Sequence, residues 1–170
     1  FRKLKKKEDP IRFKEKLSQI NIPRGEGFLI WFHVASVGEA MSILPLIEEC
    51  IKEKKIDTIV LDHHQSDIKL PKAYAIVNPN RVDDKSNLNY LCAAGVCFMF
   101  LVALNKKLRE IDWFKKNNID EPNLMNYLDL VSLGTVCDVV PLVGLNRAIV
   151  KQGLKIIKQR SNLGLKTLYD

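Results

Sequence analysis

The sequence has no long hydrophobic run, no paired-cysteine motif and no cleavable leader pattern. Its longest uninterrupted apolar stretch, residues 96–104, is too short to cross a membrane, so we expect no membrane span. The basic first residues are not followed by an apolar segment and a small-residue cleavage site, which argues for a cytoplasmic location. The four cysteines form no CxxC pair, which argues against a zinc or disulfide framework. We expect buried, reduced thiols at Cys50, Cys92, Cys97 and Cys137.

Acidic residues are scarce near the start of the chain, so the net charge of +7 is unevenly placed. Residues 1–27 hold 9 Lys/Arg against 4 Asp/Glu, and the remainder holds 18 against 16. The basic run of Lys3 and residues 5–7 fits either a contact with phosphate or a solvated arm, and the arm is the commoner meaning. The overall charge therefore does not by itself predict a nucleic-acid partner.

The sequence does contain the apolar patterning of an α/β protein. With 170 residues, 46% of them hydrophobic, the chain is long enough to bury the core of one domain. Residues 28–33 and 56–61 are apolar runs typical of strands covered on both faces. Between them, Ser36 and Glu39 have the spacing of a helix capping box. The apolar residues that follow at helical spacing are Met41, Leu44, Ile47 and Ile51. We expect a βαβ start and a parallel, Rossmann-like sheet.

The rest of the chain is predicted to be mainly helical. A short strand is expected over residues 73–77, between turn signals at Pro71 and Pro79. The predicted helices cover residues 88–109, 124–140 and 145–160, and a further helix begins at about residue 163. The helix over 145–160 is expected to have a basic outer face. Ahead of the first strand, residues 1–20 are predicted to form a polar helix that ends before a turn over 23–27.

A carboxylate and two imidazoles follow the predicted strand over 56–61, namely Asp62, His63 and His64. A further acid, Asp138, lies in the apolar segment 136–140, where an unpaired carboxylate would be costly to bury. Mg²⁺ and Mn²⁺ favour carboxylate oxygens and Mn²⁺ also accepts imidazole, so these residues indicate a Mn²⁺ or Mg²⁺ site. The alternatives are a strand-end turn at Asp62 with hydrogen-bonded histidines, and a solvated or hydrogen-bonded acid at Asp138.

Other candidate residues follow the short strand over 73–77. Asn78, Asn80 and Arg81 are suited to orienting a phosphate, although Asn-Pro-Asn is equally common in turns. Gly95 lies in an apolar segment, where it would either let a backbone approach a substrate or permit tight helix packing. Packing is the slightly favoured explanation for Gly95.

From about residue 54 onward, the sequence resembles the RecJ branch of the DHH phosphoesterases, which are single-strand-specific 5′ to 3′ DNA exonucleases. The resemblance rests on residues 59–64 (IVLDHH), 70–71 (LP), 75–81 (AIVNPNR), 91–96 (LCAAGV), 129–142 (DLVSLGTVCDVVPL) and 144–147 (GLNR). It implies hydrolysis of phosphodiester bonds in DNA repair or recombination, with single-stranded DNA as the partner. No obligate protein partner follows from it.

The resemblance also implies roles for individual residues. Asp62, His63 and Asp138 would ligate Mn²⁺ or Mg²⁺, and His64 would lie near the scissile phosphate as part of the catalytic Asp-His-His motif. Three further residues would belong to motifs that line the site, and they are Asn80, Arg81 and Gly95.

Two features of this family are missing from the sequence. Members carry two acidic motifs upstream of the Asp-His-His strand, one of which supplies metal ligands, and neither is found here. The substrate-binding domain that normally follows the core is not found either. We therefore expect a truncated core that is impaired or inactive alone.

Residues 6–50 instead resemble the N-terminal domain of Kdo (3-deoxy-D-manno-octulosonic acid) transferases, GT-B glycosyltransferases that add Kdo sugars to lipid A. The matching segments are residues 8–15 (EDPIRFKE) and 29–40 (LIWFHVASVGEA). In that family the acid at the position of Glu39 is the proposed general base, and the alternative is a capping acid paired with Ser36.

We interpret the chain as a composite of two gene fragments. Residues 1–53 would be a transferase-like βα fragment, and residues 54–170 the DHH core. The competing interpretations of function are a remnant of the transferase and a non-catalytic product of gene decay.

Overall fold

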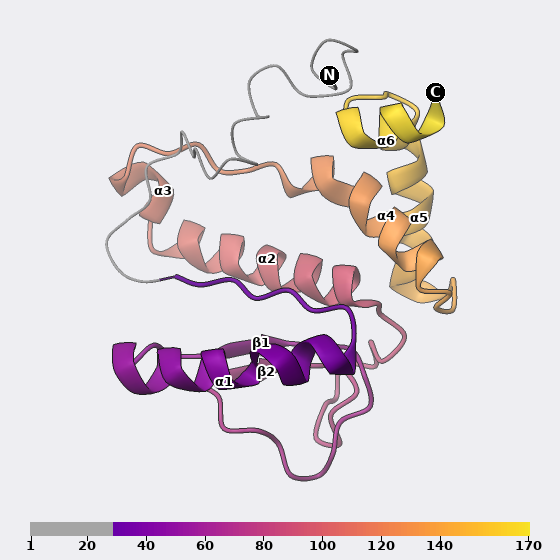
Figure 1. The fold of residues 1–170 in the computed structure, drawn as a ribbon. Helices are drawn as coiled ribbons and strands as arrows, with labels where there is room; N and C mark the ends of the chain where they lie inside the picture. Colours follow the sequence, from indigo (N-terminus) through magenta and orange to yellow (C-terminus); the bar gives the residue numbers. More distant parts are fainter. Residues whose placement is uncertain (1–28) are drawn as a thin grey trace, which may run out of the picture.

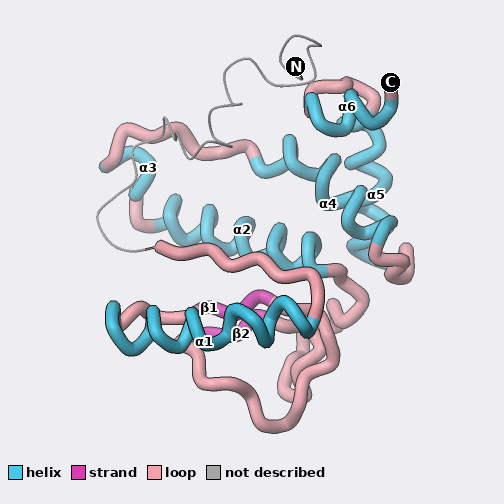
Figure 2. Tube along the Cα trace, in the orientation of Figure 1, coloured by secondary structure: helices cyan, strands magenta, loops and turns pink. Residues whose placement is uncertain are grey.

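The computed structural model describes residues 29–170, which form a small sheet and a larger helical part (Figures 1 and 2). In chain order the elements are α1 (Val37–Lys54), β1 (Ile59–Leu61), β2 (Ala75–Val77), α2 (Ala93–Glu110), α3 (Trp113–Lys116), the 3-10 helix η2 (Leu124–Tyr127), α4 (Leu128–Cys137), α5 (Gly144–Ile157) and α6 (Leu163–Tyr169). The helix expected over residues 1–20, the turn over 23–27 and the basic run at the start lie outside the described residues.

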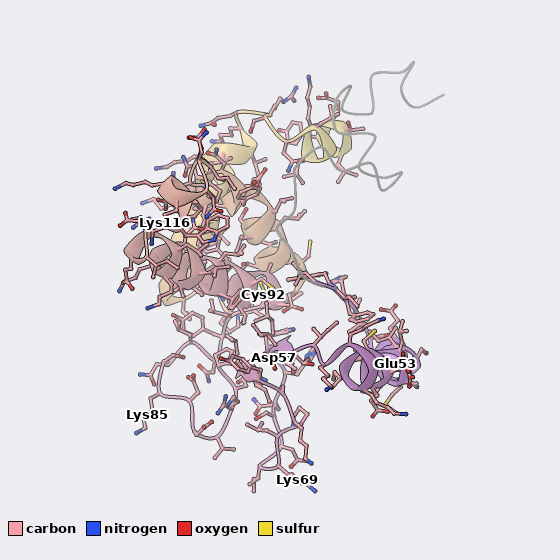
Figure 3. The ribbon with its side chains drawn as sticks, turned by 90° about the vertical axis from the view of Figure 1, so that its left-hand side faces the viewer. Glu53, Asp57, Lys69, Lys85, Cys92 and Lys116 are labelled. Carbon is pink, nitrogen blue, oxygen red and sulfur yellow. The ribbon has the colours of Figure 1, made fainter. Side chains whose placement is uncertain are left out.

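The strands β1 and β2 pair in parallel, with Ile59 opposite Ala75 and Leu61 opposite Val77. This pairing and the mainly helical remainder confirm the predicted α/β class with a parallel sheet. The backbone N–H of Asp62 donates to the carbonyl of Val77 at 3.1 Å, so the pairing continues one residue past β1. The loops that follow the strands carry Lys69, at the bottom of Figure 3, and Lys85, at its lower left.

The expected strand over residues 28–33 is wrong for its described part. Residues 29–34 have no regular secondary structure, and Leu29 and Trp31 are 70% and 68% exposed. A short apolar run specifies a strand only where a neighbouring strand pairs with it, and within the described sheet β1 pairs with β2 alone. The βαβ start is therefore not formed by residues 29–61.

The start of α1 follows the predicted capping pattern. The Oγ of Ser36 accepts a hydrogen bond from the backbone N–H of Glu39 at 3.2 Å. The carboxylate of Glu39 in turn accepts the backbone N–H of Ala35 at 2.7 Å. Two of the N–H groups that a helix start leaves unpaired are thereby satisfied.

The apolar face of α1 differs from the prediction. Met41, Leu44 and Ile51 are exposed, and the half-buried residues are Ala40, Ile43, Ile47 and Cys50. Both sets recur at helical spacing, so the sequence pattern alone does not select between them. In Figure 3, α1, which carries the labelled Glu53, stands to one side of the other elements. None of its described side chains is buried.

The core lies where α4 packs between α5 and α2. Its buried members are Leu128, Val131 and Ile149, and the partly buried residues packed on them are Ala94, Phe98, Leu145 and Ile156. In Figure 1, α4 and α5 run side by side, and α2 lies below them. Within residues 29–170, no helix is both long and apolar enough to span a membrane.

The cysteines are less uniformly buried than expected. Cys92 is buried and its sulfur accepts the N–H of Gly95 at 3.4 Å, which caps α2. Cys50 and Cys97 are half-buried, and burial raises the pKa of the Cys97 thiol. Cys137 is exposed, which corrects the expectation of a core thiol there. It lies at the last residue of α4, where the helix leaves the core.

Two glycines allow α4 to approach its neighbours closely. A Cβ at Gly134 would lie 2.8 Å from the Cβ of Ala94 in α2. A Cβ at Gly153 in α5 would overlap the carbonyl oxygen of Leu128 and the side chain of Ser132. Interiors are packed too densely to absorb such an overlap without movement of the helices.

We expect Gly153→Ala to lower the free energy of unfolding by about 1–3 kcal/mol, because the added methyl group separates α4 from α5. The matched control is Gly38→Ala in α1, where the nearest atom to an added Cβ is the Ser36 Oγ at 4.0 Å. This control should raise the free energy by up to about 1 kcal/mol. Urea unfolding followed by circular dichroism measures both, and equal effects would contradict the close crossing of the two helices.

Candidate functional site

The predicted site residues gather at the edge of the sheet where both strands end. Asp62, His63 and His64 follow β1 directly, and Asn78, Asn80 and Arg81 follow β2. Because β1 and β2 are parallel, their carboxyl ends meet at the same edge, which is where ligands commonly bind in α/β sheets.

The carboxylate of Asp62 organises the turn that leaves β1. Its Oδ1 accepts the backbone N–H groups of His63 at 2.8 Å and His64 at 3.2 Å, and it lies 2.8 Å from His64 Nδ1. Partial burial alone would raise the pKa of Asp62, but the hydrogen bonds from His64 and His63 outweigh it. The pKa of Asp62 therefore lies below its usual value, and this carboxylate is ionised at neutral pH.

His63 points from the end of β1 toward the end of α4. Its Nδ1 lies 3.6 Å from the Oδ2 of Asp138, the residue that caps the C-terminus of α4. The side chain of His63 is 17% exposed and that of Asp138 is 40% exposed. The separation is longer than a hydrogen bond and within the range of an ion pair. The structure thus places Asp138 beside His63, as a shared site requires.

His64 lies on the outside of this edge. Its side chain is 77% exposed, and its ring centroid is 4.4 Å from that of His63. The ring is held by its contact with Asp62 and is otherwise open to solvent.

Two asparagines after β2 hold the Asp62–His64 segment in place. Asn78 is buried, and its amide donates to the carbonyl of His64 at 2.9 Å and to Asp62 Oδ2 at 3.5 Å. Asn80 donates to the carbonyl of His63 at 2.7 Å and to that of Asn89 at 3.2 Å. Because the side-chain amides of both asparagines donate to other residues of the chain, we infer that these asparagines hold the Asp62–His64 segment in position.

Arg81 and Gly95 have different surroundings from those expected of site-lining residues. The guanidinium of Arg81 pairs with both carboxylate oxygens of Asp83 and donates to the carbonyl of Ile76 at 2.8 Å. Its hydrogen bonds lower the pKa of Asp83. Gly95 lies in the first turn of α2, and the atoms nearest to an added Cβ belong to Leu91. Their roles toward a substrate remain predictions.

Residues that the sequence did not single out support Asp138. The buried amide of Asn146 donates to the carbonyls of Tyr90 at 2.7 Å and Pro141 at 2.9 Å, which fixes the turn after α4. In the same turn Val139 has φ of 56°, a left-handed conformation that is rare for a β-branched residue. The sequence draws attention to Asn146 only as part of residues 144–147, which carry the family resemblance, and it carries no signal for the left-handed backbone at Val139.

The described residues include the donor types that bind a divalent ion, but too few of them lie together to hold one. Carboxylates and imidazole are donors that Mn²⁺ accepts. His63 pairs with Asp138, and Asp62 pairs with His64. Within residues 29–170, however, no group of three His, Cys, Asp or Glu side chains is placed to hold one ion. This part of the chain does not complete a ligand set.

We expect Asn80→Ala to lower the free energy of unfolding by about 1–2 kcal/mol, because the carbonyls of His63 and Asn89 each lose a donor. Asn89→Ala is the matched control, since the Asn89 carbonyl accepts this bond through the backbone alone. The control should change the free energy by less than about 0.5 kcal/mol. Hydrogen exchange at the His63 and His64 amides should rise only in Asn80→Ala, and unchanged exchange there would contradict the positioning role.

The family model for "DHH family, N-terminal domain" matches residues 33–135 of this chain. The chain is also similar to proteins named "Single-stranded-DNA-specific exonuclease RecJ" from three bacteria. The relative from Dickeya dadantii is 46% identical over 103 residues, which cover 61% of this chain and 18% of the relative. That from Escherichia coli is 44% identical over 116 residues, or 68% and 20%. That from Thermus thermophilus is 36% identical over 118 residues, or 69% and 16%.

A different relative is the "Probable 3-deoxy-D-manno-octulosonic acid transferase, mitochondrial" of Arabidopsis thaliana. It is 36% identical over 61 residues, which cover 36% of this chain and 14% of the relative. Both resemblances inferred from the sequence are thus found. The chain spans about a fifth or less of the length of these relatives. No solved structure matches it.

Proposed function

Because this chain belongs to the DHH family, we propose that it carries part of the phosphodiester-cleaving core of a RecJ-type exonuclease for single-stranded DNA. The observation that supports this most is the 3.6 Å approach of Asp138 to His63, the residue that follows Asp62 in the chain. The end of β1 and the end of α4 thereby present ligand-type side chains at one edge. The substrate follows from the names of the relatives and is part of the proposal.

We assign the proton-handling role to His64. An ionised Asp62 can only accept a hydrogen bond, so the 2.8 Å contact requires the proton to lie on His64 Nδ1. The Nε2 of a neutral ring is then an acceptor, on a side chain that is 77% exposed. A phosphate at this edge would find a proton acceptor whose orientation Asp62 fixes.

The proposed donors for a Mn²⁺ or Mg²⁺ ion are Asp62, His63 and Asp138. Such an ion lowers the pKa of bound water and stabilises charge on phosphate oxygens. Since the described residues form donor pairs and no group of three, we propose that this chain binds one ion weakly. It would then cleave DNA slowly until further acidic donors complete the set.

A transferase remnant is the second candidate, and the Arabidopsis match supports it. Its general base would be Glu39, whose carboxylate instead accepts the N–H of Ala35 in the described structure. The boundary between residues 1–53 and 54–170, and the origin of the two parts in different genes, belong to this proposal. The exposed surface of α1 is compatible with a segment that did not arise beside the rest.

Titration of the full chain with Mn²⁺ in a calorimeter tests the proposed donors. We expect one weak site, with affinity lowered roughly tenfold or more by Asp62→Asn or Asp138→Asn because each variant removes a charged donor. Asp67→Asn is the matched control, since Asp67 lies in the exposed loop after β1 and accepts the N–H of Ile68. Tight binding of two ions, or equal loss in the control, would contradict the assignment.

Release of nucleotides from 5′-labelled single-stranded DNA tests the proposed activity. With Mn²⁺ present, we expect the unaltered chain to release little more than Asp62→Asn, because the donor set is incomplete. Rapid Mn²⁺-dependent release that Asp62→Asn abolishes would contradict the proposed impairment. If nucleotide release is equal in both proteins and no Mn²⁺ binding is detected by calorimetry, the exonuclease assignment fails. The interpretation of the chain as a non-catalytic product of gene decay would then be left.

A further inference from the structure

The segment between Asp138, which caps α4, and the end of α6 differs from the rest of the described chain in its charge. Residues 139–169 contain six Lys/Arg and no Asp/Glu, whereas residues 28–138 contain 12 against 15. The positive charge outside the first 27 residues is therefore concentrated on one helical segment. A concentrated patch of one sign attracts a partner of the opposite sign more than the same charge spread over the surface.

Four of these cations form a stripe along α5, which we call the α5 basic stripe. It consists of Arg147, Lys151, Lys155 and Lys158, at intervals of four, four and three residues. With 3.6 residues per turn, these intervals place all four on one face, over about 16 Å of helix. All four residues are exposed.

The opposite face of α5 is committed to the core. Asn146, Ile149 and Gly153 are buried there, and Ile149 belongs to the cluster formed with α4. The α5 basic stripe must therefore face away from α4. Packing of α5 on α4 holds the four cations in a fixed line.

The α5 basic stripe has no acidic partner among the described residues. The ion pairs of Lys106, Lys107 and Lys115 are with Glu110 and Asp112, on and just after α2. The nearby Arg160 pairs with Asp170 and stacks on Tyr169, and it is not part of the stripe. The charges of the stripe are thus available to an external anion.

The α5 basic stripe begins close to the candidate site. Asp138 caps α4, and α5 starts six residues later at Gly144. The intervening turn is fixed by the bond from Asn146 to the Pro141 carbonyl at 2.9 Å. A chain of phosphates lying on the stripe would therefore run from the far end of α5 toward the turn that carries Asp138.

We propose that the α5 basic stripe binds the phosphate backbone of single-stranded nucleic acid and leads the strand to the edge that carries Asp62, His63 and Asp138. This inference rests on the proposed function. Phosphates recur at regular intervals along a strand, as the four cations do along α5, and backbone contacts of this kind carry no base specificity.

An anionic membrane is a different partner with the same charge. Helices that bind membrane surfaces insert an apolar face opposite their lysines. In α5 that face contains Ile149 and Gly153 and is buried against α4, so it has nothing to insert. The observations favour nucleic acid.

Fluorescence anisotropy of a labelled single-stranded oligo(dT), with the full chain in EDTA, tests the inference without cleavage. We expect Lys151→Gln/Lys155→Gln to weaken binding and to reduce the slope of log K against log salt by about 1.4, or about 0.7 per lysine. The matched control is Lys106→Gln/Lys107→Gln, which removes the same charge from α2, where both lysines lie beside Glu110. Unfolding midpoints of both variants show that they fold.

Three outcomes would overturn the inference. These are equal losses in the two variants, no loss in the α5 variant, and α5-dependent binding to phosphatidylserine vesicles without binding to oligo(dT). The proposed function has a separate readout in the calorimetric Mn²⁺ titration, because oligo(dT) binding is measured in EDTA, where no metal ion takes part. If the α5 variant weakens oligo(dT) binding but the full chain shows no Mn²⁺ binding by calorimetry, the inference is retained and the proposed function is overturned.

Discussion

The candidate site depends on one contact between distant parts of the chain, the approach of His63 Nδ1 to Asp138 Oδ2 at 3.6 Å. A polar residue such as His63 often ends a strand, whereas Asp138 caps the C-terminus of α4, where the helix dipole disfavours a carboxylate. Together they join the edge of the sheet to the helical part. A modest, half-exposed pair of this kind adds little stability by itself, so the surrounding packing must hold it.

That packing comes from two different sources. On the helical side, Gly134 and Gly153 let α4 approach α2 and α5 closely, and Asn146 fixes the turn that follows Asp138. On the sheet side, Asn78 and Asn80 hold the backbone of His64 and His63 through their amides. The residues that position the site are thus small or neutral polar groups, and the charged residues are left to face the solvent edge.

The sequence predicted the features that depend on local order and missed those that depend on distant neighbours. The polar residues at the end of β1 and the cap at Ser36 and Glu39 follow from neighbouring residues alone. The strand over 28–33 failed because an apolar run does not reveal whether another strand will pair with it. The sequence also did not predict the pairing of the Arg81 guanidinium with Asp83, while the role of Arg81 toward a substrate stays a prediction. The contact of His63 with Asp138 could be inferred from family resemblance and not from spacing.

The central claim is that residues after β1 and at the end of α4 form one divalent-ion site, and paramagnetic broadening by Mn²⁺ in the NMR spectrum of the full chain tests it most directly. The account predicts that amide signals of residues 62–64 and 137–139 lose intensity together at the lowest Mn²⁺ concentrations. Loss confined to one of these segments would contradict it. Earlier loss at the acidic residues of α1, which include Glu48, Glu49 and Glu53, would also contradict it.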